Sequence, residues 1–226
     1  MPYFNIVAET SENTVVTKYE PVKRRSDSYQ SEAELEQEFI RLLCEQGYEY
    51  LPIHTEKDLI ANLRKKLEEL NNYQFSDTEW EDFFKNTVAN PNEHIVEKTR
   101  KIQEDNVQVL TRDDGSSKNI TLIDKKNIHN NRLQVINQYA ISMDNGAKHN
   151  NRYDVTVLVN GLPLVHIELK RRGVSIREAF NQINRYQRES FWAGHGLYEY
   201  IQIFVISNGT HTKYYSNSTR RNAERE

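Results

Sequence analysis

Residues 152–173 read RYDVTVLVNGLPLVHIELKRRG, and this stretch decides the fold. Two runs of apolar and β-branched residues flank the dipeptide Asn160-Gly161, which favours a tight turn between antiparallel strands. We therefore predict a hairpin with strands over 153–159 and 164–170.

Charged residues stand inside this hairpin where a plain apolar strand would not need them. Glu168 and Lys170 are two residues apart, so their side chains share one side of the second strand. Asp154 lies near the start of the first strand, and the hairpin can bring it beside them. Two converging carboxylates offer oxygen ligands to Mg²⁺, and a neighbouring lysine can hold a water or stabilise charge on a phosphate. The spacing thus favours a site for cleaving a phosphate ester.

The register of the hairpin tests this interpretation. A plain two-residue turn would place Asp154 opposite Ile167, on the face away from Glu168. A common site requires an odd-length loop or a bulge, with which Pro163 is compatible because it cannot donate a ladder hydrogen bond. We predict that Asp154 and Glu168 share a face.

Composition bounds the class of protein. The chain has 226 residues, 37% hydrophobic and 28% charged, and its thirteen Tyr and eight Phe can build the core of one domain. The net charge of −3 gives no global attraction for nucleic acid, so contacts with phosphate must come from a local patch. The single cysteine, Cys44, excludes an internal disulfide and a cysteine zinc cluster. Without a signal-like start or a long apolar run, we expect a soluble cytoplasmic protein.

Hydrophobic periodicity predicts helices first and a mixed sheet afterwards. Ser31 and Glu34 form a capping box before the first helix, and Gly47 ends that helix. The helices are expected over 32–46, 56–70, 77–89, about 92–103 and 176–188. Further strands are expected over 107–110, 119–124, 132–142, 199–207 and 211–216, with a loop over 143–151. The chain is read as one α/β (α+β) domain, with a helical part over about 31–105 and a mixed-sheet core over about 106–216.

The helix after the hairpin carries a second group of polar residues. Gln182 and Tyr186 are four residues apart and lie on one side of it. A local basic patch suited to a phosphate backbone surrounds this segment. Its members are Arg171, Arg172, Arg177, Arg185 and Arg188.

These residues together resemble a known family. Asp154, Glu168-Leu169-Lys170 and Gln182-x-x-x-Tyr186 resemble the PD-(D/E)xK nuclease superfamily in its Gln-x-x-x-Tyr branch. The sequence is also similar to the N-terminal nuclease domain of the R (motor) subunit of type I restriction enzymes. The stretches that carry this similarity are RYDVTVLVNGLPLVHIELKRRG, REAFNQINRY, QIFVISNGTHTKYYSN, YQSEAELEQEFIRLLCEQGYEY and LIDKKN. The resemblance covers nearly the whole chain. One departure is Tyr153, which stands where the superfamily name has proline.

The resemblance implies a restriction-endonuclease-like fold and Mg²⁺-dependent cleavage of unmodified double-stranded DNA. It implies that Asp154 and Glu168 hold the metal, that Lys170 assists the attacking water, and that Gln182 and Tyr186 steady the site or touch DNA, with Arg171 and Arg172 beside them. A carboxylate of the first helix is a further metal ligand in many members. Glu36 is our candidate for that ligand, and Glu32, one turn earlier, is the alternative.

The resemblance also implies a larger assembly. The family's R subunit carries an ATP-driven DNA translocase, and this chain contains no Gly-x-x-x-x-Gly-Lys-(Ser/Thr) loop. We therefore expect an N-terminal fragment of a longer chain, with ATP bound only by the full-length subunit. The expected partners are double-stranded DNA and the methyltransferase (M) and specificity (S) subunits, and no membrane.

Simpler interpretations stand beside these. By spacing alone, Glu168 and Lys170 are an ordinary solvated pair, and Gln182 and Tyr186 a half-buried helix face. His166 is read as a structural or DNA-side residue in preference to a metal ligand. A different class of function is a non-catalytic docking module, and a stand-alone repair or junction nuclease is a third. The presence of both carboxylates and Lys170 favours the catalytic domain, because a scaffold needs none of them.

Overall fold

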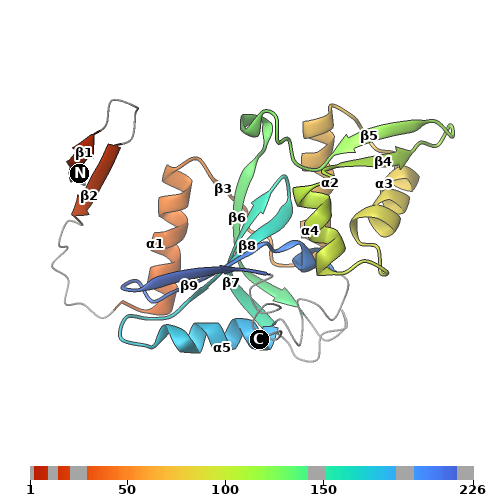
Figure 1. The fold of residues 1–226 in the computed structure, drawn as a ribbon. Coiled ribbons are helices and arrows are strands. Elements are labelled where there is room, and N and C mark those ends of the chain that lie inside the picture. The colour runs from red at the N-terminus through yellow and green to blue at the C-terminus, as the bar shows by residue number, and fades with distance from the viewer. Residues whose placement is uncertain (1–2, 10–14, 21–29, 142–150, 187–195, 218–226) are drawn as a thin grey trace, which may run out of the picture.

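A six-stranded mixed sheet forms the centre of the molecule, in a computed structural model that describes residues 3–9, 15–20, 30–141, 151–186 and 196–217 (Figure 1). The strands lie in the order β10-β9-β8-β7-β6-β3. β3 runs parallel to β6 and β8 runs parallel to β9, whereas the other neighbours are antiparallel. The bounds are β3 Glu49–Tyr50, β6 Leu133–Ile141, β7 Asn151–Val159, β8 Leu162–Leu169, β9 Ile203–Ser207 and β10 Thr212–Ser216. The predicted class, a mixed sheet flanked by helices, is confirmed.

The predicted helices are all present. They are α1 Glu32–Glu45, α2 Glu56–Asn71, α3 Asp77–Phe83 continuing as the π-helix η1 Phe84–Val88, α4 Ile95–Gln103 and α5 Ile176–Tyr186. The last two residues predicted for α5, and residues 143–150 of the predicted loop, lie outside the described residues. No helix in the described part of the chain combines the length and apolar character needed to cross a membrane.

Helix α1 covers one face of the sheet, and local sequence explains its limits. Ser31 and Glu34 form the predicted capping box, and Gly47 follows the helix with a φ of 93°. Its apolar side packs on a cluster formed by the inward side chains of the central strands. The helix contributes Leu35, Phe39, Ile40 and Leu43, and the sheet contributes Val135, Val155, Val157, Ile167 and Leu169. This packing fixes the start of α1 near the end of β8.

Helix α5 connects β8 to the parallel strand β9 and packs against both of them. Ala179 and Ile183 are fully buried in the larger core cluster, together with Phe204 of β9. The strand predicted over 199–207 is shorter in the structure. Its first two residues belong to the 3₁₀ turn η5, Leu197–Tyr200, which buries four successive side chains that a strand would divide between two faces, and β9 begins only at Ile203.

The chain between β3 and β6 forms a helical insertion beside the sheet (Figure 1). It holds α2, α3, α4 and the hairpin β4 Val107–Thr111 with β5 Ser117–Thr121. Within the described residues, β4 and β5 pair with each other as a separate two-stranded sheet, so the central sheet does not contain them. Lys98 of α4 and Glu199 of η5 form an ion pair with 0% and 1% of their side chains exposed, which ties the insertion to the core.

The N-terminal region contains a feature that the sequence reading did not assign. β1 Tyr3–Glu9 and β2 Val15–Glu20 pair as an antiparallel hairpin. The β-branched run Val15-Val16-Thr17 was the available signal for the second strand.

The β7–β8 hairpin contains the register shift on which the site depends. Its turn is Asn160-Gly161, both with positive φ, 51° and 84°, as a tight hairpin turn requires. Val159 pairs with Leu162 and Leu158 with Pro163, but Val157 pairs with Val165. Leu164 is therefore the extra residue of a bulge, and the predicted odd-length irregularity is confirmed.

The turn is anchored to the insertion. The Asn160 side chain donates to the carbonyl of Leu122 at 3.0 Å and accepts from the backbone N–H of Arg132 at 2.8 Å. A Cβ atom on Gly161 would lie 2.6 Å from the Cα of Leu63 in α2, so only glycine fits between the turn and the helix backbone.

We expect Gly161→Ala to lower the free energy of unfolding by about 3 kcal/mol, because it adds a backbone clash to the cost of a left-handed alanine. Gly115→Ala is the matched control, since Gly115 has a φ of 79° and its added Cβ would meet nothing within 4 Å. That variant should cost only about 1 kcal/mol. Urea unfolding of both variants measures the difference, and equal losses would contradict the tight contact with α2.

Candidate functional site

Asp154 and Glu168 meet at the shared edge of β7 and β8. Val155 pairs with Ile167, so the next position of the same register places Asp154 opposite Glu168. Directly opposed residues of an antiparallel pair share a face, and the predicted common face is confirmed. Asp154 Oδ2 accepts a hydrogen bond of 2.9 Å from the backbone N–H of Leu169, and the Glu168 side chain is fully buried.

Lys170 completes this group from the end of β8. Its Nζ donates to Glu168 Oε1 at 3.2 Å and to the carbonyl of Leu169 at 3.1 Å. The backbone N–H of Lys170 donates to Ser207 of β9 at 2.8 Å, so the sheet holds the residue in place. With 12% of its side chain exposed, Lys170 is a cation at the rim of a buried carboxylate. The sequence interpretation as an ordinary solvated pair is therefore wrong for Glu168.

Burial sets the charge of the two carboxylates. Burial first, and the charge of Glu168 second, raise the pKa of Asp154 to about 7, against the opposing hydrogen bond from Leu169. Burial also raises the pKa of Glu168 to about 7, although Lys170 acts in the opposite direction. Near neutral pH the pair therefore holds a proton in part of the molecules. A cation bound between the two carboxylates would favour their charged forms.

His166 supports the pair from inside the core. It is fully buried, and its Nε2 lies 3.5 Å from Glu168 Oε2. Its ring packs edge-on against Tyr153, Tyr186 and Phe204. Burial lowers the pKa of His166 to about 4, so the ring is neutral at pH 7. This burial supports the structural reading of His166 over a DNA-side one.

Gln182 and Tyr186 connect α5 to the strand that carries Asp154. Gln182 Nε2 donates to the hydroxyl of Tyr186, which donates to the carbonyl of Arg152 at 3.0 Å. Burial and the charge of Glu168 raise the pKa of Tyr186 to about 12. The two predicted residues thus lie together, and their contacts favour steadying the site, because Tyr186 is only 2% exposed.

The two candidate glutamates of α1 contact different parts of the site. Glu36 is buried and accepts hydrogen bonds from Asn137 Nδ2 at 2.6 Å and from Gln138 Nε2. Glu32 lies 3.9 Å from Lys170 Nζ and accepts from the backbone N–H of Arg171 at 3.3 Å. Burial raises the pKa of Glu36, and the charge of Asp154 adds to this effect against its amide donors. Which of the two binds metal stays a prediction.

Asn137 and Gln138 are contacts of the site that sequence reasoning missed. The stretch over 132–142 was read as a plain strand. The signal was the pair of amides inside the apolar run VINQYAI, at a place where an inward-facing strand offers few partners for polar groups.

The oxygen ligands fit a magnesium ion that shares its coordination with water and substrate. In the described residues, no group of three or more His, Cys, Asp or Glu side chains lies close enough to hold a metal ion alone. Mg²⁺ is commonly held by one or two carboxylates together with waters and substrate phosphate. Asp154 and Glu168 supply two such carboxylates, with a lysine beside them.

The predicted basic side chains that the structure describes are exposed to solvent. Arg171 and Arg172 directly follow Lys170 and are exposed, as are Arg177 and Arg185 of α5. Arg188 lies outside the described residues. A role of the exposed arginines in binding phosphate stays a prediction.

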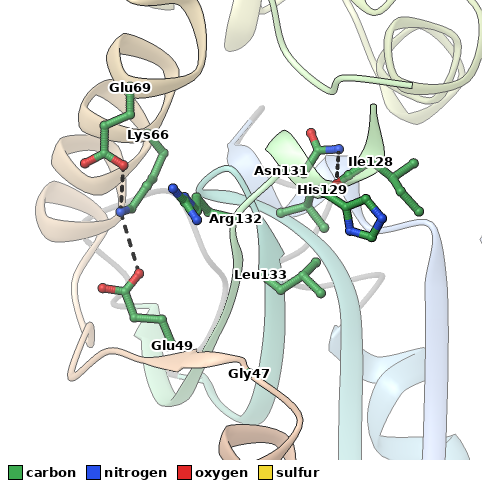
Figure 2. A pocket seen from close by; sticks show the side chains of 10 residues that line it. Gly47, Glu49, Lys66, Glu69, Ile128, His129, Asn131, Arg132 and Leu133 are labelled. Carbon is green, nitrogen blue, oxygen red and sulfur yellow. Dashed lines mark hydrogen bonds and ion pairs between the residues drawn. The ribbon is translucent and has the colours of Figure 1, made fainter. Parts of the chain in front are cut away.

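A pocket of about 830 Å³ lies at another place on the sheet (Figure 2). It is lined by the first residue of β6, the last residue of β7 and the start of β3, whereas Asp154 lies in the other half of β7. Lys66 of α2 reaches across one wall to Glu49 at 3.6 Å and Glu69 at 3.0 Å. The carboxylate pair does not line this pocket.

Comparisons with known proteins agree on one family. The family model described as "Type I restriction enzyme R protein N terminus" matches residues 29–223. The type I restriction enzyme EcoprrI endonuclease subunit of Escherichia coli is 50% identical over 216 residues, which are 95% of this chain and 68% of that protein. The SsaAORF53P endonuclease subunit of Staphylococcus saprophyticus is 42% identical over 84% of this chain. The HindI endonuclease subunit of Haemophilus influenzae is 30% identical over 79% of this chain.

The chain spans unequal shares of these relatives. The match covers 20% of the Staphylococcus saprophyticus protein and 18% of the Haemophilus influenzae protein.

We expect the carboxylate pair to make stability fall as pH rises through neutrality. Their pKa values rise from 3.8 and 4.5 to about 7 in the folded chain, so the folded state binds more protons than the unfolded state between pH 4.5 and 7. The double variant Asp154→Asn, Glu168→Gln should therefore gain roughly 2–4 kcal/mol relative to the natural chain between pH 5 and pH 8. Urea unfolding at the two pH values measures this change.

His166 also changes stability with pH, but because its pKa is lowered, its contribution rises with pH. Both proteins keep His166, so the difference between them reports the carboxylate pair alone. Glu81→Gln, at an exposed carboxylate of α3, is the control and should show no such gain. An equal pH dependence in the double variant and the natural chain would contradict the raised pKa values.

Proposed function

This chain belongs to the family of type I restriction enzyme R protein N termini, and on that premise we propose that Asp154, Glu168 and Lys170 form the active site of its DNA endonuclease domain. One observation supports the proposal most strongly, namely two buried carboxylates opposed across a hairpin with a lysine bonded to one of them. Burying two acids side by side destabilises a fold unless a cation or a proton compensates them. A binding function for a divalent cation explains why the chain keeps them.

The reaction we propose is hydrolysis of a phosphodiester bond of double-stranded DNA with Mg²⁺ as cofactor. Asp154 and Glu168 would hold the ion, which supplies charge to polarise the phosphate and lowers the pKa of a bound water. Lys170 Nζ, now donating to Glu168 Oε1, is placed to orient the attacking water or to stabilise the added negative charge on the phosphate. Glu36 would serve as a further carboxylate from α1.

The surrounding residues have separate tasks in this proposal. Gln182 and Tyr186 hold α5 against the start of β7 and so keep Asp154 in register. Arg171 and Arg172 are exposed beside Lys170 and would bind the DNA backbone. The field of these arginines is local, in keeping with the net charge of −3 for the whole chain.

We further propose that the domain works inside a larger enzyme. Cleavage would follow ATP-driven translocation of unmodified DNA by motor domains, in a cytoplasmic complex with the M and S subunits. The support for this is the family of the chain and its likeness to proteins named as type I restriction enzyme endonuclease subunits.

Calorimetric titration with Mn²⁺ tests the site. We expect the natural chain to bind Mn²⁺, and both Asp154→Asn and Glu168→Gln to lower the affinity at least tenfold, because each removes a charged ligand without changing its size. Lys170→Met should keep Mn²⁺ binding in this chain. We expect this chain to cut DNA weakly or not at all by itself, so cleavage is measured in the full-length subunit assembled with its partners, where Lys170→Met should lower the rate by a factor of about 100 because it removes a catalytic cation but no ligand.

Glu81→Gln is again the control for the loss of a negative charge on the surface. Absence of Mn²⁺ binding, or binding that both ligand variants leave unchanged, would contradict the catalytic site. It would favour the alternative of a docking module built on a nuclease fold.

A further inference from the structure

Gln138 has a backbone conformation that does not belong in a strand. Its φ is 52°, in the left-handed region, although it lies within β6 and is not glycine. Such a conformation is costly for a residue with a Cβ atom, and it persists where surrounding contacts impose it. The register is unchanged on both sides, because Asn137 pairs with Val155 and Tyr139 pairs with Tyr153. Gln138 therefore stands opposite Asp154.

The residue pairs before and after Gln138 face opposite sides of the sheet. Val155, the partner of Asn137, packs in the cluster covered by α1. Tyr139 and Tyr153 pack instead in the larger core cluster, with their rings stacked 6.3 Å apart. In a regular strand, residues two apart would share a face. The left-handed turn at Gln138 breaks this alternation at the level of the carboxylate pair.

The break has a direct consequence for Glu36. Consecutive residues of a strand normally point to opposite faces, yet Asn137 and Gln138 both reach this one carboxylate. Asn137 Nδ2 donates to Glu36 Oε1 at 2.6 Å, and Gln138 Nε2 donates to Glu36 Oε2. Each oxygen of Glu36 is thus held by its own amide, and the carboxylate cannot rotate without losing a hydrogen bond.

The first of these amides is itself oriented. The hydroxyl of Tyr50 in β3 donates to Asn137 Oδ1 at 2.9 Å. Because a carboxylate only accepts, the Asn137 amide must present its NH₂ to Glu36 and its oxygen to Tyr50. The short strand β3, at the edge of the sheet, therefore contributes to the position of Glu36.

The second amide is held in place at a cost in local stability. Gln138 Oε1 is buried and accepts no hydrogen bond from the described residues, in addition to the left-handed backbone. A chain selected for stability alone would favour glycine here, because only glycine adopts a positive φ without steric cost. Strain of this kind is typical of residues that hold a functional group in place.

We propose that Gln138 and Asn137 are positioning residues that fix the Glu36 carboxylate at the point of β6 opposite Asp154, from where its charge acts on an ion held by Asp154 and Glu168. This inference rests on the proposed function of Asp154 and Glu168. It adds that the Glu36 carboxylate is held by the amides of β6, at the left-handed residue Gln138, and not by other residues of α1.

Two substitutions of Gln138 separate positioning from stability. Gln138→Met keeps the length of the side chain and the strain but removes the amide. Gln138→Gly removes both the amide and the strain, so it should unfold at a temperature roughly 3 °C above that of the methionine variant. Calorimetric titration with Mn²⁺ should nevertheless show an affinity about tenfold below that of the natural chain in both variants.

The matched control lies on the same strand. Gln134 also donates an amide to a carboxylate, Glu49, at 3.0 Å, and Glu49 lines the pocket of Figure 2, which Asp154 does not line. Gln134→Met should leave the affinity for Mn²⁺ unchanged. Natural affinity in both Gln138 variants, or an affinity in them that follows their thermal stability, would overturn the inference.

Asp154→Asn, measured in parallel, distinguishes a failure of the clamp on Glu36 from a failure of the metal site itself. Loss of Mn²⁺ binding in Asp154→Asn together with natural affinity in the Gln138 variants would overturn the clamp and leave the proposed function intact. A natural chain that binds no Mn²⁺, or an Asp154→Asn variant with natural affinity, would overturn both.

Discussion

The extra residue in the β7–β8 hairpin is the constraint on which the site depends. Side chains alternate along a strand, so a shift of one position moves a residue to the other face. Without the bulge at Leu164, the turn would bring Asp154 opposite Ile167, whose side chain packs in the cluster covered by α1. With the bulge, Asp154 stands opposite Glu168, on the face of the sheet that Lys170 also shares. A turn held against α2 at Gly161 and tied by the Asn160 side chain keeps this register fixed.

The burial of the two acids explains much of what surrounds them. Asp154 and Glu168 lose hydration, and their neighbours replace it only in part: a backbone N–H from Leu169 and the ammonium of Lys170. The pKa of each rises to about 7 as a result. A bound cation would remove the repulsion between the two charges, in keeping with the proposed metal site. The neutral His166 behind them adds packing without adding charge.

The two helices act on the site in different ways. Helix α5 fixes the start of β7 through the hydroxyl of Tyr186. Helix α1 supplies the carboxylate of Glu36, which accepts a hydrogen bond from Asn137 of β6. The left-handed backbone of Gln138 lets the amide next to Asn137 reach the same carboxylate. The strained backbone of β6 thus lowers local stability, and in return the Glu36 carboxylate is held in place.

Much of the fold and part of the site could be predicted from the sequence. Apolar periodicity and end signals placed each α-helix of the described residues, since capping boxes, glycines and spacing act within a few residues of chain. The Asn160-Gly161 turn, the pair Glu168 and Lys170, and the pair Gln182 and Tyr186 were readable for the same reason. The strand predicted over 199–207 became partly a 3₁₀ turn, because periodicity in a short apolar run does not distinguish the two. The assignment of β4 and β5 to a separate sheet also depended on partners distant in the chain.

The sequence by itself determined which residues could share a strand face or a helix side, because those relations follow from periods of 2 and 3.6 residues. It required a bulge for the site but could not place it at Leu164, since the bulge depends on how the hairpin packs against α2. Tertiary structure alone brought Glu36 of α1 to Asn137 and Gln138, about a hundred residues later, and set the left-handed backbone that allows both amides to reach it. Burial likewise arises only when the layers close, so the charge state of Asp154 and Glu168 was a property of the fold and not of their spacing.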